Sequence, residues 1–209
     1  MSDDVSIYGD DGREYHSRFD VGLEMAAMET IKWLILGHLL FLGGVALALL
    51  LRIDMGPVWM TPLFGLPLLW AGRRHRQWAR IAVFLLGFTA VHYLAVTVAQ
   101  RTFSPAGMLF PNGSSMLAGL YGGAIGAAGS FALCFVFRQL REGVATLVLT
   151  VFGTLMLTGV GGIGVYLFLN GGGGGDGFAS AFMQMVWIYS PWQLLFAYLL
   201  AKTLEPIDE

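Results

Sequence analysis

Six long apolar stretches account for most of this sequence, and none of them has an Asp, Glu, Lys or Arg in its interior. They cover residues 31–53, 57–71, 81–100, 116–137, 143–169 and 182–201. A helix of about 20 apolar residues crosses a bilayer core about 30 Å thick, and a charge at mid-bilayer is costly. The pattern therefore predicts an all-α fold, a polytopic transmembrane helical bundle of six spans.

The composition limits what surrounds the chain. Hydrophobic residues make up 56% of it and charged residues only 12%, against roughly 25% charged residues in soluble domains, so the lipid bilayer is the predicted environment. A net charge of −2 argues against nucleic acid, which is bound by a basic face. We divide the chain into a cytoplasmic acidic tail with an interfacial helix (1–30), a six-helix transmembrane domain (31–202) and a short cytoplasmic tail (203–209).

The positions of Lys and Arg predict the orientation of the spans, because short cytoplasmic loops carry the excess of these residues. With six spans and the N-terminus inside, ten Lys and Arg residues lie on the cytoplasmic side and only Arg52 and Arg101 lie outside. Both termini are therefore predicted to be cytoplasmic. The predicted location is a plasma membrane, of the bacterial inner-membrane kind.

The second stretch, 57–71, is the least regular of the six. It has only 15 residues and contains Pro57, Pro62 and Pro67. At 1.5 Å per residue it would reach about 22 Å, less than the hydrocarbon width, and each proline removes a backbone hydrogen bond. It is either a short, distorted helix of the bundle or a broken segment that lines a cavity, and a re-entrant course is the alternative to a crossing.

The N-terminal segment is acidic: eight of the 14 acidic residues lie in the first 29 positions. Ser17 and Asp20 have the spacing of a capping box, and apolar residues recur at helical intervals from Phe19 to Leu34. We expect a helix that begins at about Arg18, runs along or through the membrane interface and continues into the first span. Its acidic side suits a partner protein better than anionic lipid; the alternative is a solvated helix end.

Glycine is abundant, with 29 residues, and the fourth stretch carries a regular set of small residues. This set consists of Gly119, Gly122, Gly123, Gly126 and Ser130. Small residues four positions apart let two helix backbones approach closely in a membrane. We predict a central packing helix, whose partner is another span of the same chain or a second copy.

The charge-free interiors also limit the chemistry. Without carboxylates inside the spans there is no pair for hydrolysis and no group to couple protons or sodium to transport, so we do not expect an enzyme. His38 and His92 both fall inside predicted spans. They are candidate axial ligands of one b-type haem, or single ligands of a chlorophyll-type pigment. The alternative is hydrogen bonding within the bundle, for His92 with Thr89, Tyr93 or Gln100.

Polar groups also gather in the last stretch. Four residues that could line a substrate path lie near its middle: Gln184, Tyr189, Ser190 and Trp192. Pro191, which lies among them, has no N–H to give the carbonyl of Trp187. Together with Pro62 and Pro67, this segment is a candidate for a polar pocket between helices, and a kinked packing helix is the alternative.

These features leave three functional hypotheses. The first is a non-catalytic structural or accessory subunit of a larger membrane assembly, whose partners are lipid and other membrane protein subunits. The alternative is a small-solute or ion transporter or channel component, with its path between the second, fourth and sixth spans. The third is a haem- or chlorophyll-binding subunit for electron or energy transfer through His38 and His92.

Overall fold

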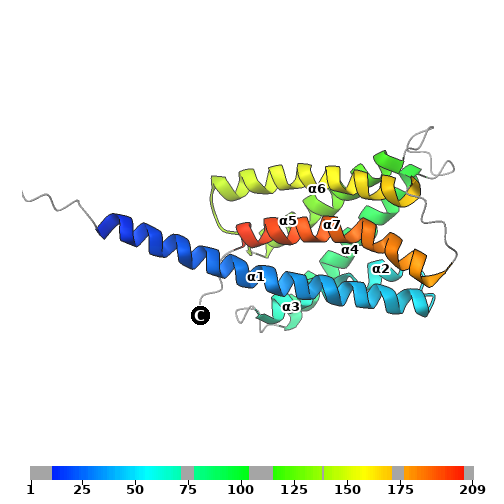
Figure 1. Ribbon diagram of the computed structural model, residues 1–209, viewed down its shortest axis with the longest axis horizontal. Coiled ribbons are helices and arrows are strands. Elements are labelled where there is room, and N and C mark those ends of the chain that lie inside the picture. The colour runs from blue at the N-terminus through cyan, green and yellow to red at the C-terminus, as the bar shows by residue number, and fades with distance from the viewer. Residues whose placement is uncertain (1–10, 72–77, 104–114, 138, 171–176, 205–209) are drawn as a thin grey trace, which may run out of the picture.

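Helices make up nearly all of the described chain, which contains no strand (Figure 1). The computed structural model describes residues 11–71, 78–103, 115–137, 139–170 and 177–204. In chain order the helices are α1 (Asp11–Leu50), α2 (Gly56–Trp59), α3 (Thr61–Ala71), α4 (Trp78–Phe103), α5 (Ser115–Val136), α6 (Val144–Asn170) and α7 (Phe178–Thr203). The predicted all-α fold is confirmed.

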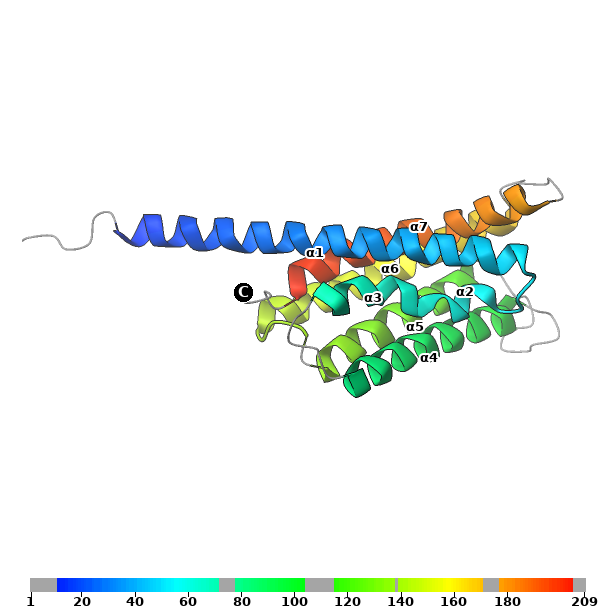
Figure 2. The same cartoon turned by 90° about the horizontal axis from the view of Figure 1, so that it is seen from below.

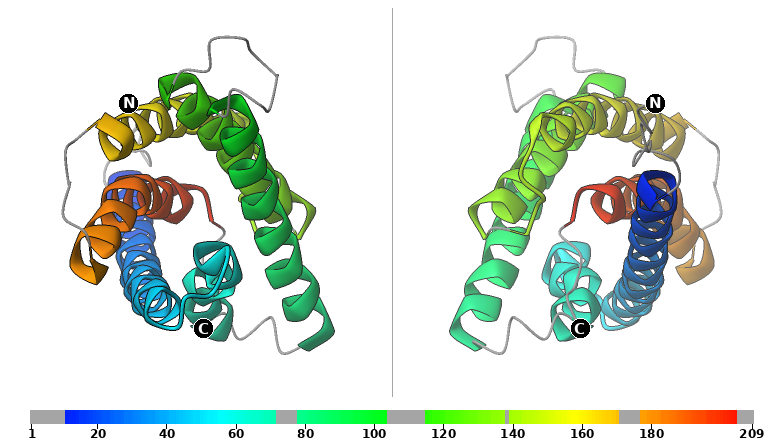
Figure 3. Two further views of the ribbon diagram at one scale, coloured as in Figure 1. Left: turned by 90° about the vertical axis from the view of Figure 1, so that its right-hand side faces the viewer. Right: turned by 90° about the vertical axis from the view of Figure 1, so that its left-hand side faces the viewer.

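The helices run back and forth along one direction and close into a ring (Figures 2 and 3). α1 packs against α3 and α3 against α4, and the contacts continue through α5 and α6 to α7, which returns to α1. The short α2 lies at the end of α1 and also touches α4. The interior of the ring therefore brings together side chains that are far apart in the sequence.

Four segments are long and apolar enough to cross a membrane: Ala27–Leu50, Ala82–Phe103, Ser115–Val136 and Val144–Phe168. In the last of these segments, which belongs to α6, only 11% of the most apolar 18-residue stretch is buried inside the protein. Large apolar side chains such as Leu147, Val151 and Leu155 are therefore exposed along α6. An apolar surface of this extent marks a membrane or partner contact, and the length and composition of the four helices indicate a membrane protein.

The other two predicted spans are less regular. α7 has 26 residues, but polar residues interrupt it, and it is not among the four apolar segments. Residues 57–71 form two helices, α2 and α3, separated at Met60, so this stretch is a broken segment. It runs back along α1, so that α4 begins at the opposite end of the bundle from α2 (Figure 2). The count of six spans stays a prediction.

α1 is one continuous helix of 40 residues. It begins at Asp11, earlier than the predicted start near Arg18, and its apolar segment begins only at Ala27. At 1.5 Å per residue it is about 60 Å long, about twice the thickness of a bilayer core. Its N-terminal part extends beyond the other helices (Figure 1), and the segment predicted as interfacial continues directly into the first span.

A tight turn reverses the chain after α1. Arg52 has a left-handed conformation with φ 54°. The N–H of Ile53 donates to the carbonyl of Ala48 at 2.9 Å, and the N–H of Arg52 donates to that of Leu49 at 3.2 Å, which is the Schellman pattern of helix C-termini. Gly56 then starts α2 so close to α1 that a Cβ on it would lie 2.6 Å from Cβ of Ala48. The turn thus holds α2 against the end of α1.

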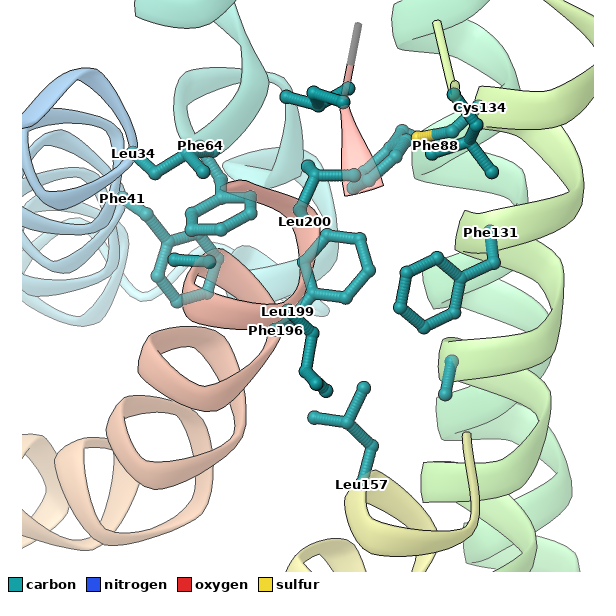
Figure 4. Close-up of a cluster of buried hydrophobic side chains, with 14 of the residues drawn as sticks. Leu34, Phe41, Phe64, Phe88, Phe131, Cys134, Leu157, Phe196, Leu199 and Leu200 are labelled. Atoms are coloured by element: carbon teal, nitrogen blue, oxygen red, sulfur yellow. The ribbon is translucent and has the colours of Figure 1, made fainter. Parts of the chain in front are cut away.

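The ring encloses a core rich in aromatic side chains (Figure 4). The ring centroid of Phe196 in α7 lies 5.2 Å from that of Phe131 in α5. It lies 6.2 Å from both Phe64 in α3 and Phe88 in α4. Aromatic pairs contribute about 0.5–1.5 kcal/mol each beyond the area that they bury. Phe196 of α7 therefore packs against aromatic residues of three other helices. Two of these residues, Phe64 and Phe88, also line a cavity.

Candidate functional site

A cavity of about 140 Å³ lies inside the ring, between α3, α4, α5, α6 and α7. Six of the side chains in its wall can form hydrogen bonds: Thr61, His92, Ser130, Tyr189, Trp192 and Gln193. Another part is bare backbone, because five glycines line it: Gly119, Gly122, Gly123, Gly126 and Gly161. None of its described lining residues is an Asp, Glu, Lys or Arg. The cavity is therefore a mainly apolar space with a few polar groups.

Hydrogen bonds connect four helices along one side of this cavity. The hydroxyl of Tyr189 in α7 lies 3.1 Å from Nε2 of His92 in α4. Nδ1 of the same imidazole is hydrogen-bonded to Oγ1 of Thr61 in α3. The Thr61 hydroxyl in turn donates to the carbonyl of Val58 in α2, at 2.6 Å. His92 thus links α3 to α7 across the interior of the ring.

Counting the protons shows which group donates in each of these hydrogen bonds. A threonine hydroxyl has one proton, and Thr61 gives it to the backbone carbonyl of Val58. Oγ1 of Thr61 must then accept from Nδ1–H of His92. In a neutral imidazole the second nitrogen is an acceptor, so Nε2 of His92 accepts from the Tyr189 hydroxyl. The hydrogen bonds therefore run from α7 through α4 and α3 to α2, and His92 is held in a single tautomer.

A proline explains why this series of hydrogen bonds ends at the carbonyl of Val58. In a continuous helix the carbonyl of Val58 would accept from the N–H of residue 62, but that residue is Pro62 and has no N–H. Thr61, the residue just before this proline, supplies the missing proton through its side chain. The break between α2 and α3 is therefore satisfied locally, as an interrupted helix in a membrane requires.

A second buried pair joins α1 to α7. Nδ1 of His38 lies 2.7 Å from Oε1 of Gln193. An amide oxygen only accepts, so Nδ1 of His38 is the donor. The two side chains are 5% and 6% exposed, and Gln193 also lines the cavity. The pair therefore ties α1 to the cavity wall, although α1 itself does not line the cavity in the described structure.

Trp192 lies over the glycine wall. A Cβ on Gly126 would be 3.3 Å from Cζ2 of Trp192, and the indole stacks on Phe196 with ring centroids 5.3 Å apart. Nε1 of Trp192 is buried and has no hydrogen-bond partner among the described residues, and the same holds for Oγ of Ser190. The indole N–H of Trp192 thus has no acceptor among the described residues, whereas a buried indole usually finds one.

Three glycines of α5 face two neighbouring helices, α6 and α4. A Cβ on Gly119 would lie 2.3 Å from the carbonyl oxygen of Gly161 in α6. One on Gly123 would lie 3.0 Å from the carbonyl oxygen of Leu157, also in α6. Gly122 faces α4, where the carbonyl oxygen of Ala95 would be 3.3 Å away. The close neighbours of these glycines are thus helices of the same chain, and a side chain on any of them would push two backbones apart.

The structure brings some of the predicted site residues together and leaves others apart. All five predicted small residues of α5 line the cavity or face its neighbours: Gly119, Gly122, Gly123, Gly126 and Ser130. Of the predicted substrate path, Tyr189 and Trp192 line the cavity, whereas Gln184 and Ser190 do not. His92 lines the cavity and His38 does not.

The sequence interpretation missed Thr61 in the site and Gly37 at a nearby contact between helices. Thr61 was not singled out, although its place directly before Pro62 and three residues after Val58 is a signal that a hydroxyl could replace the missing N–H. Gly37 of α1 was also missed. A Cβ there would lie 2.0 Å from the carbonyl oxygen of Phe64, so α1 and α3 cross in backbone contact at this glycine.

The hydrogen bonds of His38 and His92 bear on whether these residues are free to bind a cofactor. Both ring nitrogens of His92 are engaged with side chains, so iron or magnesium ligation by His92 would require one of these bonds to break. Nδ1 of His38 is likewise engaged with Gln193. Among the residues that the structure describes, no group of three or more His, Cys, Asp or Glu side chains is placed to hold a metal ion.

No known protein family, curated protein or solved structure matches this chain. Its function is therefore inferred from the geometry of the cavity and of the helices around it.

Proposed function

We propose that this protein is a membrane transporter or channel component that binds a small, uncharged solute in its cavity. The observation that carries the proposal is the position of the cavity beside the break between α2 and α3 and beside Pro191, a proline within the continuous helix α7. Thr61 follows the break between α2 and α3, and Tyr189 and Trp192 flank Pro191 in α7. Discontinuous helices are where many transporters bind their substrates, because their unpaired backbone groups are tolerated only beside a cavity.

The wall chemistry supports an uncharged solute. A charged solute inside the membrane needs an opposite charge or several strong hydrogen bonds, and the described wall has no Asp, Glu, Lys or Arg. His92, Tyr189 and Thr61 already bond to one another. Apart from the side chains of Ser130, Trp192 and Gln193, the remaining wall is aliphatic, aromatic or glycine backbone, which favours contact with a mainly apolar molecule.

Retention of a small molecule tests the proposal. Wild-type protein and Gly126→Leu would be purified in mild detergent, and the small molecules extracted from each compared by mass spectrometry. Leucine at this position fills the cavity beside Trp192, because even a Cβ on Gly126 lies 3.3 Å from that indole. Gly159→Leu is the matched control, since a Cβ on Gly159 has no neighbour within 4 Å.

We expect a compound that wild type and Gly159→Leu retain and that Gly126→Leu loses. Uptake of that compound into proteoliposomes, with the same three proteins, then distinguishes transport from binding alone. Equal retention of every compound by all three proteins would overturn the proposal.

A non-catalytic, accessory or structural subunit of a larger membrane assembly is the second candidate, and α1 favours it. The segment of α1 before Ala27 extends beyond the other helices (Figure 2), and acidic residues are concentrated there. A helix that leaves its own bundle offers a contact to another protein. A mild-detergent pull-down would compare wild type with the pair Asp20→Asn and Glu24→Gln, with Glu142→Gln as control. Recovery of the chain without any co-purifying protein would count against this role.

A further inference from the structure

We infer that the molecule bound in the cavity is neutral, about the size of a single six-membered ring, and carries one oxygen that accepts a hydrogen bond from the Gln193 amide. This inference rests on the proposed function and specifies the class of solute.

The volume sets the size. The cavity measures about 140 Å³, and an apolar protein cavity of about 150 Å³ holds a benzene molecule. A single ring therefore fills the space. A larger amphiphile could place only its ring-sized head here.

The wall sets the shape and the polarity. Backbone of α5 at Gly122, Gly123 and Gly126 forms a surface without side chains, which lets a flat molecule approach a helix closely. Aromatic rings of Phe64, Phe88, Tyr189 and Trp192 line another part of the wall, and aromatic rings pack well on one another, face to edge or offset. A flat, unsaturated ring is therefore a better match than a branched aliphatic molecule.

The hydrogen-bonding groups set the position of the oxygen. Gln193 gives Oε1 to His38, and that bond uses neither of its two amide protons. The side chain lines the cavity and is only 6% exposed, so an oxygen on the bound molecule is placed to accept a hydrogen bond from this amide. Phenols and ring ketones are the chemical class that combines these features.

The test compares two probes that differ in one group. Binding of 4-fluorophenol and of fluorobenzene to the full-length protein in detergent would be followed by ¹⁹F NMR, with empty micelles as the reference. Each probe is measured on wild type, Gln193→Leu, Gly126→Leu and the control Gly159→Leu. Gly126→Ala, which adds only a methyl group, replaces Gly126→Leu if the larger residue prevents folding.

We expect wild type and Gly159→Leu to prefer the phenol by about 3- to 10-fold, the value of one hydrogen bond. Gln193→Leu should bind both probes equally, because the comparison between probes cancels any general effect of the substitution on the cavity. Gly126→Leu should bind neither probe. If wild type binds both probes equally and Gly126→Leu abolishes both, the inferred solute class is wrong while the proposed function stands. If Gly126→Leu binds both probes as wild type does, the cavity is not the site and the proposed function fails with it.

Discussion

The Thr61 hydroxyl donates a hydrogen bond of 2.6 Å to the carbonyl of Val58, the group that Pro62 leaves without its helical N–H. The same oxygen accepts from Nδ1 of His92. One side chain therefore satisfies the break between α2 and α3 and fixes the histidine that connects α3 to α7. The broken second segment and the intramembrane histidine, which look unrelated in the sequence, are parts of one hydrogen-bonded unit.

Thr61→Val should destabilise the protein, because the substitution keeps the shape of the side chain and removes its hydroxyl. The Val58 carbonyl and the His92 Nδ1–H then lose their partner together, at a cost of about 1–3 kcal/mol for each unsatisfied group. Thr61→Ser keeps the hydroxyl and should restore most of the stability. The measurement is the free energy of unfolding in mixed detergent–SDS micelles.

Thr154→Val serves as the control for the loss of a hydroxyl. Thr154 donates only to the carbonyl of Thr150 in its own helix, and that carbonyl keeps its helical N–H partner, so we expect a change of less than about 0.5 kcal/mol. If Thr61→Val were as stable as this control, the hydroxyl of Thr61 would have no structural role.

Gly119→Ala should destabilise the contact between α5 and α6. The new Cβ would lie 2.3 Å from the Gly161 carbonyl oxygen, and a backbone atom cannot move aside as a flexible side chain can. Overpacking of this kind costs about 1–3 kcal/mol. Gly43→Ala is the matched control, because a Cβ there has no neighbour within 4 Å. Thermal unfolding in detergent would measure both, and equal melting temperatures would contradict the close contact of the two backbones.

The sequence predicted the regular helices well, and the reason is physical. The stretch 116–137 corresponds to α5 (Ser115–Val136) and 143–169 to α6 (Val144–Asn170), because a charge-free apolar run must keep its backbone hydrogen-bonded inside lipid. α1 was predicted less well. Its start at Asp11 lies in a polar segment, where no bilayer constrains the chain and the apolar pattern gives no boundary.

The partners of His92 could not be predicted in the same way. Spacing along one helix pointed to Thr89, Tyr93 and Gln100, which neighbour His92 in α4, but its partners are Thr61 and Tyr189 from other helices. Contacts between helices depend on how the ring closes, and periodicity within one segment does not contain that information. The prolines were the useful signal, because each marks a place where backbone and side chains must rearrange together.

The pair formed by His38 and Gln193 should stabilise the fold as a coupled unit. A double-mutant cycle with His38→Leu, Gln193→Leu and the combined variant isolates their interaction. We expect a coupling energy of about 0.6–1.7 kcal/mol, the range found for hydrogen bonds between membrane helices. His38→Leu combined with Thr154→Val should instead be additive within about 0.5 kcal/mol, since no hydrogen bond joins these two side chains among the described contacts. An additive result for both cycles would mean that the bond between α1 and α7 contributes nothing to stability.

The orientation of the helices can be tested because Cys134 is the only cysteine and is buried. Cysteines would be introduced singly at three exposed positions: Asp54, Ala79 and Glu142. Six spans with the N-terminus inside place Asp54 outside and the other two in the cytoplasm, because residues 57–71 then cross the membrane. We therefore expect a membrane-impermeant maleimide to label only the Asp54→Cys protein in intact cells, and all three after lysis. If residues 57–71 re-enter instead of crossing, the chain stays outside through Ala79, and the later helices are inverted. All three cysteines would then be labelled in intact cells, and the ten-to-two division of Lys and Arg would no longer describe the protein.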